Sequence, residues 1–144
     1  MSFREDVPGI SCDGAARLVR AAVDQAVVLG IRINAAVVDR GGNTIAFLRM
    51  PGAFLHSADL AVDKAYTAAS FGFPTGQWMA VIGDNARLKA GIPPRPRVVV
   101  LGGGFPVEEG SVRLGGIGVS GGSEAEDEAC ALAALQALGF AVPA

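Results

Sequence analysis

The chain has 144 residues, of which 51% are hydrophobic and 18% charged, so it can form a folded domain with its own core and is not disordered. The net charge of −2, without a basic cluster, argues against a nucleic-acid-binding surface. The sequence starts without a secretory signal and has no apolar run near the roughly 20 residues of a membrane span. We therefore expect a single cytoplasmic domain over residues 1–144 that binds neither membrane nor nucleic acid.

The first half of the chain predicts two helices around a β-hairpin. Ser11 or Asp13 can cap the first helix, and Gly30 is typical of its end. Residues 39–43 form a turn signal between two strand-like segments, which predicts an antiparallel hairpin. The expected elements are a helix ending near residue 29, strands over 31–39 and 44–50, and a helix over 57–70.

The second half predicts short helices, further strands and a final helix. The expected elements are helical residues from 74 or 75 onward, a short helix over 85–90, strands over 97–101, 111–114 and 116–120, and a helix over 123–138. Strands joined by a hairpin and flanked by helices indicate an α+β fold rather than repeated β–α–β units. The sequence thus predicts a mainly antiparallel sheet of five strands.

The glycine-rich segment over residues 102–122 precedes the last helix. It lacks the P-loop pattern, and it does not lie in the early β–α–β unit that a dinucleotide fingerprint requires. Ser123 and Glu126 can form a capping box, and the acidic first turn would repel a phosphate, so structural capping is the favoured interpretation. Two narrower alternatives stay open: the amides of residues 120–122 could bind one carboxylate, or Asp127 could act as an acid or base.

Cysteine and histidine are too sparse to predict a metal site. Cys12 and Cys130 are far apart, each within a predicted helix, and His56 is the single histidine. We interpret both cysteines as buried small apolar residues rather than as partners in a disulfide.

Three cationic or titratable side chains follow one another around a Pro-Gly turn. Arg49 ends the second strand and could hold a carboxylate with its planar fork, or lie solvated at the strand end. Lys64 has no acid four residues away and could be a base or Schiff-base nucleophile, although its stem could also cover alanines with the ammonium in water. His56 could be a general base, an axial haem ligand or a surface residue.

Four further polar or glycine positions are candidates for the same pocket. Asp39 closes the first strand and could take part in catalysis or form an Asx-turn. Thr75 could cap the next helix or present its hydroxyl to a substrate. Ser120 and Gly121, just before the last helix, are candidates for substrate binding.

Four blocks together resemble the GlcG/HbpS-like family, which is also found as the C-terminal domain of PduO-type proteins. They are VVDRGGNTIAFLRMPGA, SADLAVDKAYTAASFGFPT, LGGGFPV and GGIGVSGGSEAEDEACALAAL. The resemblance covers nearly the whole chain. It implies a five-stranded antiparallel sheet flanked by helices and a homo-oligomer, a tetramer or octamer. It also carries the family pattern onto Asp39, Arg49, Lys64, Thr75 and the Ser120-Gly121 pair.

The chain departs from that pattern at two positions. Pro51 stands where the family often has an acidic residue, and His56 is not part of the pattern. Extracellular haem-binding members carry export signals, and this sequence starts without one.

Two functions of different classes follow. The first is a cytosolic catabolic enzyme without cofactor or metal, in which Arg49 binds a small unsaturated or keto carboxylate and Lys64, His56 or Asp39 moves a proton in tautomerisation, hydration or enamine hydrolysis. The alternative is a haem- or tetrapyrrole-binding protein with His56, Met50 or Tyr66 as axial ligand.

Overall fold

A computed structural model describes residues 1–143 and shows an antiparallel sheet between helices. In chain order the elements are α1 (Cys12–Leu29), β1 (Asn34–Asp39), β2 (Thr44–Arg49), α2 (His56–Phe71), the 3-10 helix η1 (Thr75–Gln77), α3 (Trp78–Ile82), α4 (Ala86–Gly91), β3 (Gly104–Glu109), β4 (Val112–Ser120) and α5 (Glu124–Ala137). The predicted α+β class is confirmed. The prediction of five strands is wrong, because the described residues form a sheet of four, in the order β2-β1-β4-β3.

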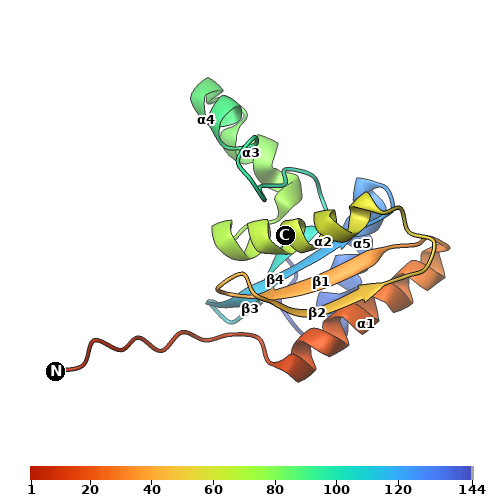
Figure 1. Ribbon diagram of the computed structural model, residues 1–144, viewed down its shortest axis with the longest axis horizontal. Coiled ribbons are helices and arrows are strands. Elements are labelled where there is room, and N and C mark those ends of the chain that lie inside the picture. The colour runs from red at the N-terminus through yellow and green to blue at the C-terminus, as the bar shows by residue number, and fades with distance from the viewer. Residues whose placement is uncertain (144) are drawn as a thin grey trace.

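The sheet separates two layers of helices (Figure 1). Helices α1 and α5 pack on one face, where they enclose the main apolar core with side chains such as Leu18, Val37 and Leu135. Helix α2 covers the other face, over a smaller cluster that includes Ala61 and Ala65. Helices α3 and α4 extend away from this body.

Glycines in β4 let α2 approach the sheet closely. A Cβ atom on Gly116 would lie 2.3 Å from the carbonyl oxygen of Ala65, and one on Gly118 would lie 2.0 Å from that of Ala61. The backbone of the helix therefore rests on the backbone of the strand.

Two strand predictions in the second half are wrong. Residues 97–101 form no strand: Arg97 has a φ of 66°, and Thr67 of α2 bonds to this segment by accepting from the amide of Val99 and donating to the carbonyl of Arg97. The missed strand is β3. Pro106 lies within it, which β3 tolerates because it is an edge strand. The segments 111–114 and 116–120 are one continuous strand, β4.

The predicted helix ends are confirmed. Ser11 accepts a hydrogen bond from the amide of Gly14, and Gly30 ends α1 in the left-handed conformation, with a φ of 72°. The capping box of Ser123 and Glu126 is present at the start of α5. No helix in the part of the chain that the structure describes is long and apolar enough to cross a membrane.

Both cysteines lie in helices, as predicted, and both are free thiols. Cys130 packs in the main core, as expected, but the expectation is wrong for Cys12, which is exposed at the start of α1. Burial, with smaller contributions from the acidic groups of Asp127 and Glu126, raises the pKa of the Cys130 thiol to about 11.

Candidate functional site

The loop between β2 and α2 is held in place by two arginines. Arg49 Nη2 donates to the carbonyl of Ala53, and Arg32 Nη1 donates to the carbonyl of Pro51 over 2.8 Å. The amide of Met50 also bonds to the carbonyl of Ile33. The loop therefore has a defined shape, although most of its residues are exposed.

This loop presents two large apolar side chains beside the only histidine. Phe54 is 51% exposed and Leu55 is 79% exposed, and the exposed His56 follows as the first residue of α2. We call Phe54, Leu55 and His56 the loop surface. Arg49 uses one guanidinium nitrogen on the loop carbonyl, so its other donors remain available to a ligand.

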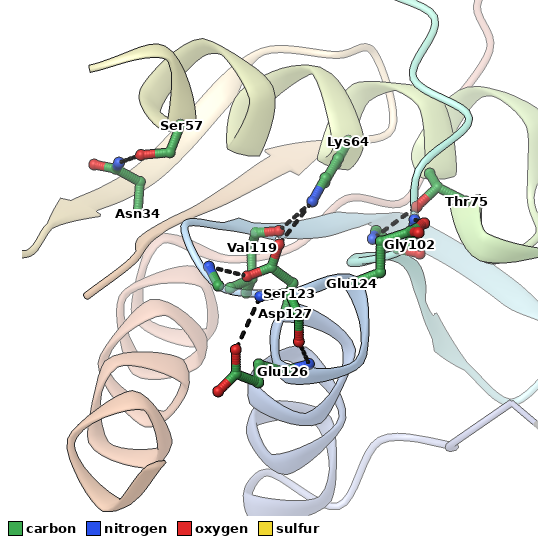
Figure 2. A network of polar contacts seen from close by, with 12 residues as sticks. Asn34, Ser57, Lys64, Thr75, Gly102, Val119, Ser123, Glu124, Glu126 and Asp127 are labelled. Carbon is green, nitrogen blue, oxygen red and sulfur yellow. Dashed lines mark hydrogen bonds and ion pairs between the residues drawn. The ribbon is translucent and has the colours of Figure 1, made fainter. Parts of the chain in front are cut away.

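A buried amide lies behind the loop surface. Asn34 begins β1, where it pairs with Arg49 on one side and with Ser120 on the other. Its Nδ2 donates to the hydroxyl of Ser57 over 2.6 Å (Figure 2). That hydroxyl donates to the carbonyl of Phe54. Its Oδ1 is buried without a hydrogen-bond partner among residues 1–143. We did not predict a role for Asn34. The sequence signal that could have indicated one is a polar residue at the start of an otherwise apolar strand.

Lys64 forms a buried ion pair with Asp127. The two side chains come from α2 and α5, and they are 2% and 3% exposed. The Lys64 ammonium lies 3.1 Å from Oδ2 of Asp127 and donates to the carbonyl of Val119 over 2.9 Å (Figure 2). Oδ1 of Asp127 accepts from the amide of Gly122 over 2.8 Å. Both charges are thus paired and hydrogen-bonded, as buried charges require.

The interpretation that the Lys64 ammonium lies in water is wrong, and its role as a base or nucleophile stays a prediction. The ammonium is not in water, and it does not point into an open pocket, because Asp127, Val119 and Gly103 surround it. A Cβ atom on Gly103 would lie 2.9 Å from Lys64 Nζ. Burial raises the pKa of Asp127 above its ordinary value, while the charge of Lys64 and the hydrogen bond from Gly122 oppose that rise.

The remaining candidates near the Lys64 pair are buried or form hydrogen bonds within the protein. Thr75 is fully buried and accepts from the amide of Gly104 over 2.8 Å; its side chain does not cap η1. Ser120 is 3% exposed at the end of β4. Gly121 has a φ of 144°, and a Cβ there would lie 2.3 Å from the carbonyl oxygen of Arg32. The amide of Gly122, one of those proposed for a substrate carboxylate, is used by Asp127.

Asp39 lies apart from the other candidates. It ends β1, opposite Gly115, whereas Asn34 and Arg49 mark the other end of the hairpin. Its Oδ1 accepts from the amides of Gly41 and Asn43, so the Asx-type turn is present. Burial alone would raise the pKa of Asp39, but hydrogen bonds from the Asn43 side chain and from the backbone amides of the turn outweigh it and lower the pKa. The expectation that Asp39 and Arg49 share one rim is wrong.

Comparison with known proteins agrees with this fold and assigns the family. The family model described as "Haem degrading protein HbpS-like" matches residues 10–136. The corrinoid adenosyltransferase PduO of Salmonella typhimurium is 35% identical over 124 residues, which are 85% of this chain but 37% of PduO.

Two solved structures are similar over nearly their whole length. The PduOC:haem complex has a TM-score of 0.85 at 32% identity, covering 92% of this chain and 97% of that one. HbpS has a TM-score of 0.86 at 35% identity, covering 95% of each chain. The chain therefore belongs to the HbpS-like family, as its sequence motifs had indicated.

Proposed function

We propose that this protein binds haem or a related tetrapyrrole at the loop surface. The observation that carries the proposal is the exposure of Phe54 and Leu55 directly beside the exposed His56. A tetrapyrrole is a flat apolar ring with carboxylate substituents, and these side chains offer apolar contact, an imidazole and nearby guanidinium groups. The family description and the haem complex of the similar PduOC structure support the same class of ligand.

Each side chain has a distinct role in this proposal. His56 would bind the iron through an imidazole nitrogen, and Phe54 and Leu55 would make apolar contact with the ring. Arg49 and Arg32 bind ring carboxylates with the donors that the loop carbonyls leave free. Bound haem iron would supply redox and ligand-binding chemistry at this surface.

The other two proposed axial ligands are less suitable. Met50 is partly buried against the main core, and its sulfur accepts a hydrogen bond from the amide of Ile33. Tyr66 lies near the opposite end of α2, with the Arg97 guanidinium 3.6 Å from its ring centre. His56 is the exposed member of the three.

The comparisons favour tetrapyrrole binding over the enzyme hypothesis. Proton transfer by Lys64 stays a prediction, and it would require the pair with Asp127 to open, because the ammonium is buried. Arg49 fits either function, since its free donors suit a ring carboxylate and a small substrate equally.

Haemin titration tests the proposal. We expect a saturable shift of the Soret band in the unaltered protein and its loss in His56→Ala, because the iron loses its axial nitrogen. Leu55→Ala should raise the Kd about tenfold, since a buried leucine contributes about 1.5–3 kcal/mol. Val112→Ala is the matched control, because Val112 is 40% exposed at the start of β4, at the opposite end of the sheet from Arg49. A Soret shift that persists unchanged in His56→Ala would exclude His56 as the ligand.

We also propose that the protein is a homo-oligomer. Besides the loop surface, the projecting α3 and α4 expose Met79, Val81 and Leu88, and apolar side chains gathered on a surface indicate an interaction site. Light scattering should give a mass that is a multiple of 14.6 kDa, and Val81→Asp should lower it. A mass of one chain at all concentrations would contradict the proposal.

A further inference from the structure

A second cleft lies at the opposite end of the sheet from the loop surface. It encloses about 300 Å³ between the β1–β2 turn (Arg40, Gly41, Gly42), the C-terminal part of α2 (Tyr66, Ala69, Ser70) and Arg113 of β4. The loop surface lies at the N-terminal end of α2, so the two sites are separated by the length of that helix (Figure 1). This size is at the lower limit for small-molecule sites.

Two guanidinium groups in this cleft have no carboxylate partner. Arg40 and Arg113 form no ion pair within residues 1–143. Arg113 Nη1 donates to the carbonyls of Ala69 and Ser70, over 3.0 and 3.1 Å, and Arg40 Nη1 approaches the carbonyl of Arg113 at 3.5 Å. Arg113 Nε is buried without a hydrogen-bond partner in the same set of residues. The positive charges are therefore held in position but not neutralised.

Two acidic groups near the cleft, Asp39 and Asp63, are already engaged. Asp39 accepts the amides of the turn, and Asp63 pairs with Arg97, whose guanidinium lies on the outer ring face of Tyr66. Glu108 pairs with Arg113 in the β3–β4 register but does not line the cleft, so the lining carries the two positive charges of Arg40 and Arg113 and no negative charge. The two positive charges favour binding of a negatively charged ligand in the cleft.

Gly42 lets the ring of Tyr66 pack directly against the β1–β2 turn. Gly42 has a φ of 88°, and a Cβ there would lie 2.4 Å from Cε2 of Tyr66, so a larger residue would displace the ring. Tyr66 and Ser70 add two hydroxyl groups to the lining. Hydroxyls beside paired guanidinium groups are a donor set for planar or tetrahedral oxyanions.

We propose that the Arg40–Arg113 cleft binds the oxyanion of a small ligand, a carboxylate or a phosphate. The fork of Arg40 and the free donors of Arg113 hold the anion, and the Tyr66 hydroxyl fixes its orientation. This site is independent of the loop surface, and its occupation does not require haem.

Calorimetric titration with succinate and with inorganic phosphate tests this site and identifies the anion. We expect saturable binding of at least one anion, with a Kd raised about tenfold or more in Arg40→Gln, because a hydrogen bond to a charged group is lost. Binding of succinate alone would identify a carboxylate site, and binding of phosphate alone a phosphate site. Arg40 is exposed, so the variant should fold, which its melting curve checks.

Arg87→Gln is the matched control, since Arg87 is an exposed arginine of α4 outside the cleft. It should leave anion affinity unchanged, and Arg40→Gln should leave the haemin titration unchanged. Absence of saturable binding by both anions, or equal loss of affinity in Arg40→Gln and Arg87→Gln, would overturn the proposal.

Discussion

Lys64→Met is expected to lower the free energy of unfolding by about 3–5 kcal/mol at neutral pH, because it leaves the buried carboxylate of Asp127 without its counter-charge. Methionine keeps most of the volume of the lysine stem, so the loss reports the charge more than a cavity. The carbonyl of Val119 also loses its bond from the ammonium. Urea unfolding at neutral pH measures the change.

The destabilisation should depend on pH with a definite sign. Burial already raises the pKa of Asp127, and the variant removes the opposing charge of Lys64, so the pKa rises further. A carboxyl with a raised pKa binds its proton more tightly in the folded chain than in the unfolded one. Stability is therefore lost as the pH rises through the folded-state pKa, and the loss is smallest below the unfolded value of about 3.9. The free energy of unfolding of Lys64→Met should therefore be closest to that of the unaltered protein in acidic buffer.

Two comparisons isolate the buried charge. Asp63→Asn breaks the partly exposed pair with Arg97 and should cost no more than about 1 kcal/mol. Lys64→Met combined with Asp127→Leu removes both buried charges and should recover part of the stability lost by the single variant. If the double variant is less stable than Lys64→Met at neutral pH, an uncompensated carboxylate is not the cause.

The ends of the helices could be predicted because their signals are local. Ser11, Gly30 and the Ser123–Glu126 box each act within a few residues, and the structure has all three. The β1–β2 hairpin is predictable for the same reason, since its turn is encoded between Asp39 and Asn43.

Contacts between segments that are distant in the sequence could not be predicted from the sequence. Lys64 lacks an acidic partner at helical spacing, and its partner lies 63 residues away on another helix. The valines of segment 97–101 have strand propensity, yet Thr67 bonds this segment to α2. Propensity is overridden wherever such tertiary contacts are stronger.

The positions of Arg49 and His56 were therefore easier to predict than the surroundings of Lys64 and Asp39. Arg49 and His56 do flank one loop, as their positions indicated. Asp39 lies at the other end of β1 from Arg49, although the two residues are close in the sequence. The length of the strand and the alternation of its side chains between the two faces decide where the carboxylate lies. The Arg40–Arg113 cleft brings together residues 73 positions apart, which only the pairing of β1 with β4 reveals.

Gly118→Val is expected to lower the free energy of unfolding by about 3 kcal/mol or more, because its side chain would enter the backbone of α2. The Cβ alone would lie 2.0 Å from the carbonyl oxygen of Ala61 and 2.5 Å from the amide of Ala65. Backbone atoms cannot move aside as a flexible side chain does, so the whole helix must shift. Intrinsic strand propensity predicts the opposite sign, since valine is favoured over glycine in strands.

Thermal and urea unfolding of a graded series decides between these effects. Gly118→Ala adds one methyl and should cost about 1–3 kcal/mol. Gly91→Ala, in α4 with no atom within 4 Å of its added Cβ, should be neutral or stabilising by up to about 1 kcal/mol. If Gly118→Val stabilises the protein, then close contact between the backbones of β4 and α2 at Gly118 does not contribute to stability. Because α2 carries both His56 and Tyr66, a shift of the helix should also weaken haemin and anion binding in the folded fraction of Gly118→Val.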